Sequence, residues 1–465
     1  MNPSYWNERT ASIAIAGILS VVFGAALWLS GGTTQSIVAF PLIALFLFLL
    51  TSFELALFGI IVCLFVDVHV SVFSSAVWYS LFLLLAFVLH HPEFSWRRFA
   101  NPLTIPLLVY GACIIPSLTN AFQPTESILK LFNVVGFLIA FYVFVAAVNS
   151  RERMRKAVTV FLVLAFANAL HVFVQAILGQ PRPFGFAGVM FVDYAGMGIT
   201  ATAVMGILSR GRARLAHFLV SGVLAVALLA SQTRSIWLAT AITLTLVGLS
   251  IVLKPSVWGM SRPYALGVVV AGVLVLAAAG ALTVLWSPRV EERALEVANI
   301  DPSAVSDEGV IRNSLVTRAL IWDTALNAFR AHPYVGVGVY GFPYSSIHYA
   351  RMPRMLYTRY VEMMSPHQTH LAVLSETGVI GALGFGWFLV AALRAAVRAV
   401  RSASGIRARK FAIVAAGALI YCMVSMVFTD AWLWGQGIVL LGIIAAMVVA
   451  NGKMEAIQVD SAVPH

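Results

Sequence analysis

Three arginines that stand beside long apolar segments are suited to binding an anion. Arg234 stands in a polar turn between two apolar runs, and Arg182 stands in a short loop that contains Pro and Gly. Arg318 precedes Trp322 by about one helical turn. A guanidinium group can hold a phosphate or a carboxylate through two parallel hydrogen bonds. We therefore expect these arginines to bind an anionic substrate group; the alternative for each is an interfacial, solvated or Trp-stacked arginine.

Histidines supply a second kind of chemistry. His367 and His370 follow Pro366, which suits a helix start, and their spacing would place them on one helix face. Imidazole titrates near neutral pH, so His367 is a candidate general base. Two alternatives stay open, namely a metal-binding pair without an obvious third ligand and interfacial histidines without a chemical role. His332 and His370 are alternates for the base, and Glu376 would orient a partner or pack against a polar side chain.

The elements that must position these residues are membrane helices. The chain has 465 residues, of which 60% are hydrophobic and 11% are charged, and its mean hydropathy is +0.91. Soluble domains carry roughly 25% charged residues. We therefore expect an all-α polytopic membrane protein with about 12, and up to about 14, spans. The clear candidate spans are Thr10–Leu29, Ser71–Leu89, Leu103–Leu118, Ile128–Val148, Val158–Leu178, Met190–Leu208, Tyr264–Trp286, Leu371–Val397, Ala412–Phe428 and Trp432–Ala450.

Two further apolar stretches, Gln35–Phe65 and His217–Leu253, are too long for one span and short for two. Polar residues interrupt each of them, so each is a candidate for a tight hairpin of short or tilted helices. The predicted order is N-terminal spans over 1–285, a loop domain over 286–366, C-terminal spans over 367–450 and a short, disordered tail over 451–465.

The net charge of +11 is explained by membrane topology without a nucleic-acid partner. Most of the basic residues fall in connections that we assign to the cytoplasm, as the positive-inside rule requires. Both termini then lie in the cytoplasm, and no cleavable signal is evident. Ionisable residues beside a membrane tend to mark function. Those expected at the outer helix ends, besides the arginines of the long loop, are Arg182, Asp193, Arg234, His367, His370, Glu376 and Asp430.

A polar segment of about eighty residues before the last three spans is longer than an ordinary connection. It contains an amphipathic helix with Asp307 and Glu308 near its start and Pro333 beyond its end. Its predicted apolar face consists of Ile311, Leu315, Ala319, Trp322, Leu326 and Phe329, whereas Asn327 falls elsewhere. The glycines of the segment 335–341 indicate close backbone packing or a turn more than a phosphate cradle.

Several familiar kinds of site are missing from the sequence. The cysteines Cys63, Cys113 and Cys422 all lie in apolar stretches, where they form neither a disulfide framework nor a metal spacing. There is no Ser-His-Asp pattern and no P-loop, and paired carboxylates for glycoside hydrolysis do not stand out. The arginines and the histidines therefore remain the candidates for chemistry.

The order of these motifs resembles the O-antigen ligase/polymerase superfamily of bacterial envelope enzymes. An arginine in a loop is followed by a Thr-Arg-Ser turn, Arg-x-x-x-Trp, His-Pro-x-x-Gly-x-Gly, His-x-x-x-Leu and Glu-x-Gly-x-x-Gly. The matching stretches are Ser231–Trp237, Arg318–Phe342 and His367–Gly381. They cover the C-terminal half, whereas the N-terminal half agrees only in having many spans.

The resemblance implies a GT-C-like fold in the bacterial inner membrane with a long periplasmic loop and a periplasmic active site. It implies inverting transfer of O-antigen glycan from undecaprenyl diphosphate to a sugar hydroxyl of the lipid A core, without metal or nucleotide. The family's catalytic histidine maps to His367, although Gln368 stands where the family has Asn. The family's arginines map to Arg234, Arg182 and Arg318.

Three alternatives stay open at this point. An O-antigen polymerase has similar chemistry but uses a growing glycan as the acceptor. A protein O-oligosaccharyltransferase is a further relative, against which the short C-terminal tail argues. A flippase or other transporter of lipid-linked glycans belongs to another class, and transporters tend to show repeated halves and broken helices near the midplane.

Overall fold

The computed structural model describes residues 52–66, 69–70, 73–91, 99–270, 272, 314–433 and 435–462. These residues are almost entirely helical. The exception is a hairpin of two-residue strands, β1 (His69–Val70) and β2 (Phe73–Ser74), which pair antiparallel. The predicted span Thr10–Leu29, the first half of Gln35–Phe65 and the predicted helix start at Asp307–Ile311 lie outside the described residues.

Eight described helices are long and apolar enough to cross a membrane. In lipid every backbone polar group must find an internal partner, and a continuous helix provides one for each. The multi-pass prediction is confirmed, while the total number of spans stays a prediction. The eight are α6 (Pro124–Ala147), α7 (Arg151–Ile177), α8 (Phe191–Ile207) with the preceding 3-10 turn η3 (Gly185–Met190), α9 (Gly211–Ala230), α10 (Arg234–Leu253), α16 (Thr369–Ser402), α17 (Ile406–Ser425) and α18 (Gly435–Ala462).

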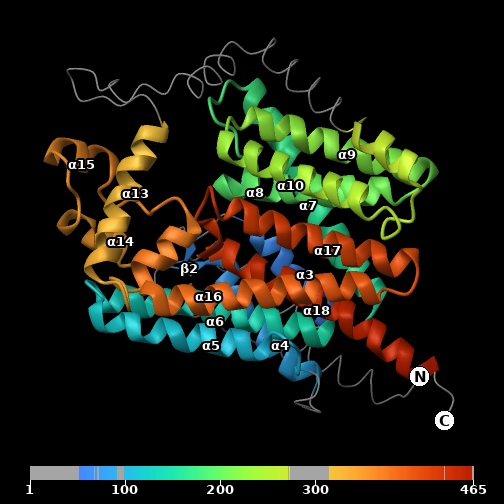
Figure 1. Ribbon diagram of the computed structural model, residues 1–465, viewed down its shortest axis with the longest axis horizontal. Coiled ribbons are helices and arrows are strands. Elements are labelled where there is room, and N and C mark those ends of the chain that lie inside the picture. Colours follow the sequence, from blue (N-terminus) through green and yellow to red (C-terminus); the bar gives the residue numbers. More distant parts are fainter. Residues whose placement is uncertain are drawn as a thin grey trace, which may run out of the picture.

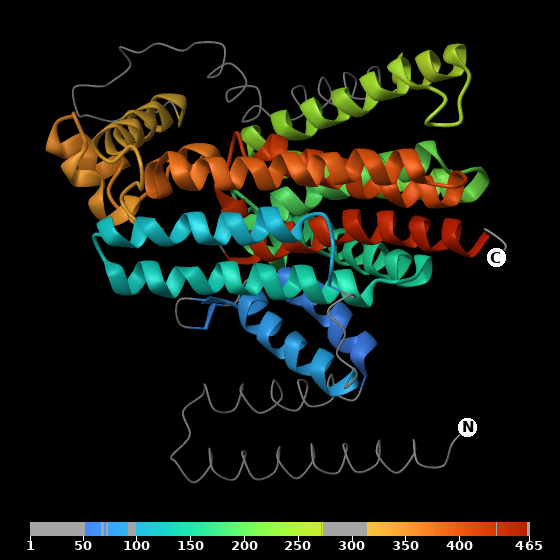
Figure 2. The same ribbon diagram turned by 60° about the horizontal axis from the view of Figure 1, so that its bottom comes forward.

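Shorter apolar helices complete the described bundle. They are α3 (Phe53–Leu64), α4 (Ser75–His90) and α5 (Thr104–Ile114), which continues into the 3-10 turn η2 (Ile115–Asn120). Helices α5, α6, α16 and α18 run side by side, and α7, α8, α9, α10 and α17 form the rest of the bundle (Figures 1 and 2). A continuous core joins them, with Tyr194, Phe388, Tyr421 and Trp432 among its largest fully buried side chains.

The stretch His217–Leu253 is the helical hairpin that its polar interruption predicts. Helices α9 and α10 are joined by Ser231–Thr233, and Gln232 adopts a positive φ of 56° in the turn. A left-handed residue at this point lets the chain reverse within three residues. Arg234 is consequently the first residue of α10.

Short connections between packed helices divide the molecule into two ends. The site end carries the connections 115–123, 178–190, 231–233 and 426–434 together with the loop domain, which we define as residues 314–368 (Figures 1 and 2). The basic end carries the connections 148–150, 208–210, 254–260 and 403–405. Basic residues gather there: Arg151, Arg153, Arg155, Lys156, Arg210, Arg212, Arg214, Lys254, Arg262, Arg394, Arg398, Arg401, Arg409, Lys410 and Lys453.

The loop domain consists of α13 (Ser314–Ala331), α14 (Phe342–Ser345), η4 (Ser346–His348) and α15 (Arg354–Tyr360). It has a hydrophobic cluster of its own, which includes Ile321, Ala325, Ala328, Val337, Phe342, Tyr357 and Val361. Helix α13 ends two residues before Pro333, as predicted.

The predicted apolar face of α13 is wrong. Leu315, Ala319 and Leu326 are exposed, whereas Asn327 is buried together with small residues of the neighbouring face. Small side chains let the helix approach the rest of the domain closely. This close packing stabilises the domain more than burial of the larger leucine side chains would. Asn327 is satisfied in this position because its amide donates to the Tyr349 carbonyl at 3.3 Å.

The prediction of a disordered tail after Asn451 is also wrong, because α18 continues to Ala462. The buried Glu455 carboxylate accepts a hydrogen bond from Arg151 Nη2 at 2.7 Å, and its other oxygen accepts from the Ser404 N–H at 2.8 Å. These contacts tie the extra turns of α18 to the starts of α7 and α17.

Candidate active site

Helix α16 is interrupted at Gly378, where φ is 63° and ψ is −168°. The loop 333–338 inserts into this break. The carbonyls of Ser375 and Glu376 accept from the N–H groups of Val337 and Gly338, both at 3.0 Å. On the far side of the break, the N–H groups of Val379 and Ile380 donate to residues 333 and 334 at 2.9 and 3.2 Å. Four bonds to the inserted loop thus replace the two that an unbroken helix would make here.

Two glycines allow the loop and the helix to meet. A Cβ on Gly336, whose φ is +67°, would overlap the backbone carbonyl of Glu376. A Cβ on Gly378 would overlap the backbone at Tyr334 and Val335. Only glycine combines a positive φ with this approach at low cost. The alternating glycines therefore serve close backbone packing, which was one of the expectations from the sequence.

Glu376 is a structural anchor of the same junction. Its side chain is buried, and its carboxylate accepts hydrogen bonds from the backbone N–H groups of Tyr340, at 2.9 Å, and Phe342. These are groups at the start of α14. Glu376 therefore holds the start of α14 against α16.

His367 lies two residues before α16 in a left-handed conformation, with a φ of 53°, so the prediction that it shares a helix face with His370 is wrong. A non-glycine residue in this region costs on the order of 1 kcal/mol and persists where its surroundings fix it. The surroundings here are the segment 426–430: the His367 N–H donates to Asp430 Oδ2 at 3.2 Å. The Thr369 N–H contacts the carbonyls of Met426 and Thr429 at 2.9 and 3.0 Å.

The imidazole of His367 faces a carboxylate and a hydroxyl. Its Nδ1 lies 3.9 Å from Asp430 Oδ1 and 3.4 Å from Ser365 Oγ. In the described part of the chain no hydrogen bond to the opposite ring nitrogen, Nε2, is present. The ring is half-buried. Asp430 and Ser365 thus lie on the Nδ1 side of the ring, opposite Nε2.

Helix α13 supports both segments that meet at this site. Trp322 Nε1 donates to the Pro366 carbonyl at 3.0 Å, one residue before His367. Arg318 Nη1 donates to the Phe428 carbonyl at 3.1 Å. Residues four apart lie on one face of a helix. The Arg-x-x-x-Trp spacing therefore lets one face of α13 contact both segments, the one that carries His367 and the one that carries Asp430.

Arg234 completes a cationic cluster with Arg318. Burial is the main reason that the pKa of Arg318 is lowered; the charge of Asp430 opposes this, and the nearby charge of Arg234 lowers the pKa further. Both side chains are partly buried. Two like charges held together in a partly buried place repel each other, and an anion with several oxygens relieves that repulsion.

The pKa of His367 is lowered, chiefly because burial disfavours the imidazolium. The carboxylate of Asp430 opposes this by raising the pKa, and the charge of Arg318 lowers it further. The free imidazole is consequently neutral at neutral pH, which is the form that accepts a proton.

Residues 219–386 match the family model described as O-antigen ligase. This match supports a relationship of residues 219–386 to the O-antigen ligase/polymerase superfamily. No curated protein matches the chain. The matched residues of this superfamily domain run from α9 into α16 and contain Arg234, Arg318, His367 and Glu376, whereas Arg182 and Asp430 lie outside them.

Not every candidate lies at the junction of α13, α16 and segment 426–430. Arg182 is exposed in the loop between α7 and η3, at the same end of the bundle. His332 Nδ1 is 3.4 Å from Asn120 Nδ2, and its ring packs edge-on against Tyr349. His370 is exposed, and its ring centre is 6.4 Å from that of Phe385.

Asp430 is the site residue whose role sequence reasoning missed. It was expected at an outer helix end, but only the fold shows that it meets His367, which is far from it in sequence. Tyr340 is a second residue that sequence reasoning missed, because its backbone N–H donates to the Glu376 carboxylate at 2.9 Å. The ammonium of Lys130 lies 4.4 Å from the centre of the Tyr340 ring. Basic residues are scarce at the site end, and this scarcity is the feature of the sequence that could have identified Lys130.

A buried polar pair, formed by one residue of α8 and one residue of α17, lies next to the segment that follows α17. Tyr421 OH donates to Asp193 Oδ1 at 3.3 Å, and both residues are buried. One turn further along α17, the Ser425 hydroxyl accepts a hydrogen bond from Trp432 Nε1 at 2.5 Å. Asp193 was expected at an outer helix end, and its burial assigns it to packing beneath the site.

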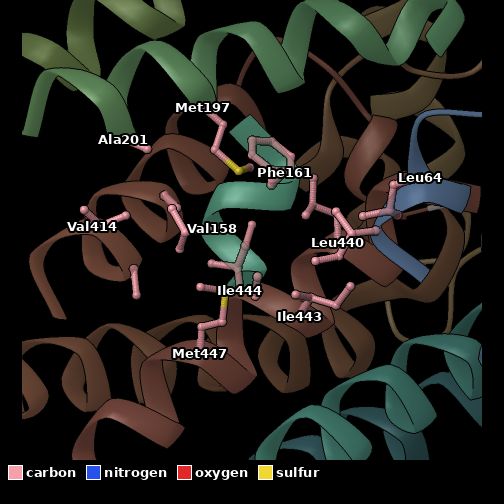
Figure 3. A pocket seen from close by; sticks show the side chains of 14 residues that line it. Leu64, Val158, Phe161, Met197, Ala201, Val414, Leu440, Ile443, Ile444 and Met447 are labelled. Carbon is pink, nitrogen blue, oxygen red and sulfur yellow. The ribbon is translucent and has the colours of Figure 1, made fainter. Parts of the chain in front are cut away.

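An apolar cavity of about 50 Å³ lies elsewhere, among α3, α7, α8, α17 and α18 (Figure 3). Its walls include Phe161, Met197, Leu440, Ile444 and Met447. None of the residues that line it belongs to the His367 site. It has the chemistry of a packing void, because apolar walls offer nothing to a charged or polar substrate.

Proposed function

We propose that this protein is an inverting glycosyltransferase that moves O-antigen glycan from undecaprenyl diphosphate to a sugar hydroxyl of the lipid A core. The match of residues 219–386 to the O-antigen ligase family model supports glycan transfer as the reaction type. The single observation that carries the proposal is the convergence of Arg234, Arg318, His367 and Asp430 at one end of the bundle.

The proposed reaction divides between the two kinds of side chain. His367 Nε2 accepts the proton of the acceptor hydroxyl while the hydroxyl oxygen bonds to the anomeric carbon. The bond from that carbon to the diphosphate oxygen breaks, and the leaving diphosphate keeps the electron pair. Arg234 and Arg318 stabilise the charge that develops on it. Attack opposite the leaving group inverts the anomeric centre, and Asp430 keeps the imidazole in orientation.

The membrane setting fits a lipid-linked donor. The site end lies opposite the basic end, so the positive-inside rule supports a periplasmic position for the site and a cytoplasmic position for the basic end in the inner membrane. Arg182, exposed at the site end, is assigned to the same diphosphate. Metal and nucleotide have no part in this proposal.

Glycan transfer by purified protein tests the proposal. The protein in detergent receives undecaprenyl-diphosphate-linked glycan and lipid A core in the presence of EDTA, beside the variants His367→Ala and His370→Ala. Glycan-bearing core from the wild type and His370→Ala, but not from His367→Ala, is the expected result. Longer glycan on the carrier would make the protein a polymerase. Folded protein that forms neither product would contradict glycan transfer and favour transport.

A further inference from the structure

A groove at the basic end of the molecule is separate from the His367 site. It lies between the start of α5 and the C-terminal half of α16, which run side by side (Figures 1 and 2), and has a volume of about 620 Å³. One part of its wall is apolar and the other is cationic. The lining residues are Pro102, Ile105, Pro106, Trp387, Ala391, Leu393, Arg394, Val397, Arg398 and Arg401.

The cationic wall consists of three arginines on one face of α16. Arg394, Arg398 and Arg401 are spaced by four and three residues, so their side chains leave the helix in the same direction. All three are exposed. Among the described residues, no carboxylate forms an ion pair with any of them. Along the helix axis they extend over roughly 10 Å, and their long side chains can converge on one group in the groove.

General requirements of a membrane helix do not account for this arrangement. The positive-inside rule places basic residues at this end but does not align them on one face beside a groove. A favourable interaction with the helix dipole is confined to the last turn, and Arg394 lies about two turns before the end of α16.

The apolar wall extends the groove toward the middle of the bundle. Trp387 and Ile105 are 46% and 64% exposed, which is unfavourable in water but suits contact with acyl chains. Tryptophan is also favoured at the level of lipid headgroups. The groove therefore offers guanidinium groups to a phosphate and an apolar surface to the chains attached to it.

We propose that this groove binds an anionic phospholipid, with its headgroup phosphate on Arg394, Arg398 and Arg401 and its acyl chains on Trp387 and Ile105. A water-soluble phosphate would use the arginines but gain nothing from the apolar wall. Basic pockets between membrane helices are suited to anionic headgroups for the same reason.

Native mass spectrometry of the full chain, reconstituted with equal amounts of phosphatidylglycerol and phosphatidylethanolamine, tests the proposal. The wild type is expected to retain phosphatidylglycerol preferentially. The triple variant Arg394→Gln, Arg398→Gln and Arg401→Gln is expected to lower the ratio of the two retained lipids by about tenfold or more, because each basic residue near a headgroup contributes a several-fold factor.

A matched control removes the same charge from the same end but outside the groove. The exposed residues Arg210, Arg212 and Arg262 serve for this, each changed to Gln, and this variant is expected to retain the wild-type ratio. A second variant with Lys at the three groove positions keeps the charge and most of the preference, which distinguishes lost binding from lost folding.

Three results would overturn the inference. If the ratio of the two retained lipids fell equally in the groove variant and the control variant, general surface charge and not the groove would explain the preference. Equal retention of both lipids by the wild type would remove the anionic preference. Displacement of phosphatidylglycerol by millimolar inorganic phosphate alone would show that the apolar wall contributes nothing.

Discussion

Replacement of Gly336 by alanine provides a sharp test of how the loop domain is joined to the membrane helices. The substitution places a Cβ where the Glu376 carbonyl lies, on a residue with a φ of +67°. The left-handed backbone alone costs alanine about 1 kcal/mol. Displacement of the loop also lengthens the bonds of Val337 and Gly338 to α16, each contributing about 1 kcal/mol. The expected loss of unfolding free energy is therefore about 3 kcal/mol.

Gly179→Ala is the matched control for this substitution. Gly179 has a φ of +81°, but a Cβ there would meet no atom within 4 Å. Gly179→Ala places alanine in a left-handed conformation without a steric clash, so a loss of about 1 kcal/mol of unfolding free energy is expected. Thermal unfolding in detergent measures both variants, and roughly 2 °C of melting temperature accompanies each kcal/mol in a large domain.

Hydrogen exchange locates the effect. The amides of Gly338 and Val379 are expected to exchange faster in Gly336→Ala than in the wild type, because both bond across the junction. Equal melting temperatures for the two alanine variants, or unchanged exchange at these amides, would refute the reasoning that the loop replaces part of the helical hydrogen bonding of α16.

The remaining predictions concern the His367 site. Trp322→Phe removes the hydrogen bond to the Pro366 carbonyl, so transfer is expected to fall about tenfold with a loss of only about 1 kcal/mol of stability; unchanged kcat would exclude a positioning role. Transfer by the wild type is expected to decline as pH falls through the lowered pKa of His367, because protonation removes the base. Asp430→Asn removes a charge that raises this pKa, so the acid limb of its residual activity should move to lower pH. Arg318→Gln removes a charge that lowers the pKa and should move the limb the other way; shifts of the opposite sign in pH–rate profiles would contradict both assignments.

The sequence was informative where the physical constraint is local. A polar turn within an apolar stretch predicted the α9–α10 hairpin, and Pro333 predicted the end of α13. The distribution of charge also separated the two ends of the bundle. The hairpin and the end of α13 each depend on residues within a few turns of one another, and the charge pattern depends on each connection taken separately.

Features that depend on distant parts of the chain were not predicted. The approach of Asp430 to His367 requires the packing of α16 against α17 and the turn that follows it. The break at Gly378 could not be predicted from the sequence, because the hydrogen bonds that stabilise it come from the loop 333–338. The buried face of α13 was misjudged because small residues, rather than leucines, allowed the closest packing.

The junction at Gly378 has a consequence for the order in which the protein is made. The first turns of α16, up to Thr377, leave two carbonyls without partners in their own helix and acquire them from Val337 and Gly338. Unpaired backbone groups are costly in lipid. Because the loop domain is synthesised before α16, its partner groups already exist when α16 emerges from the ribosome. The loop domain therefore supplies, from chain that is already made, the hydrogen-bond partners that the broken helix needs.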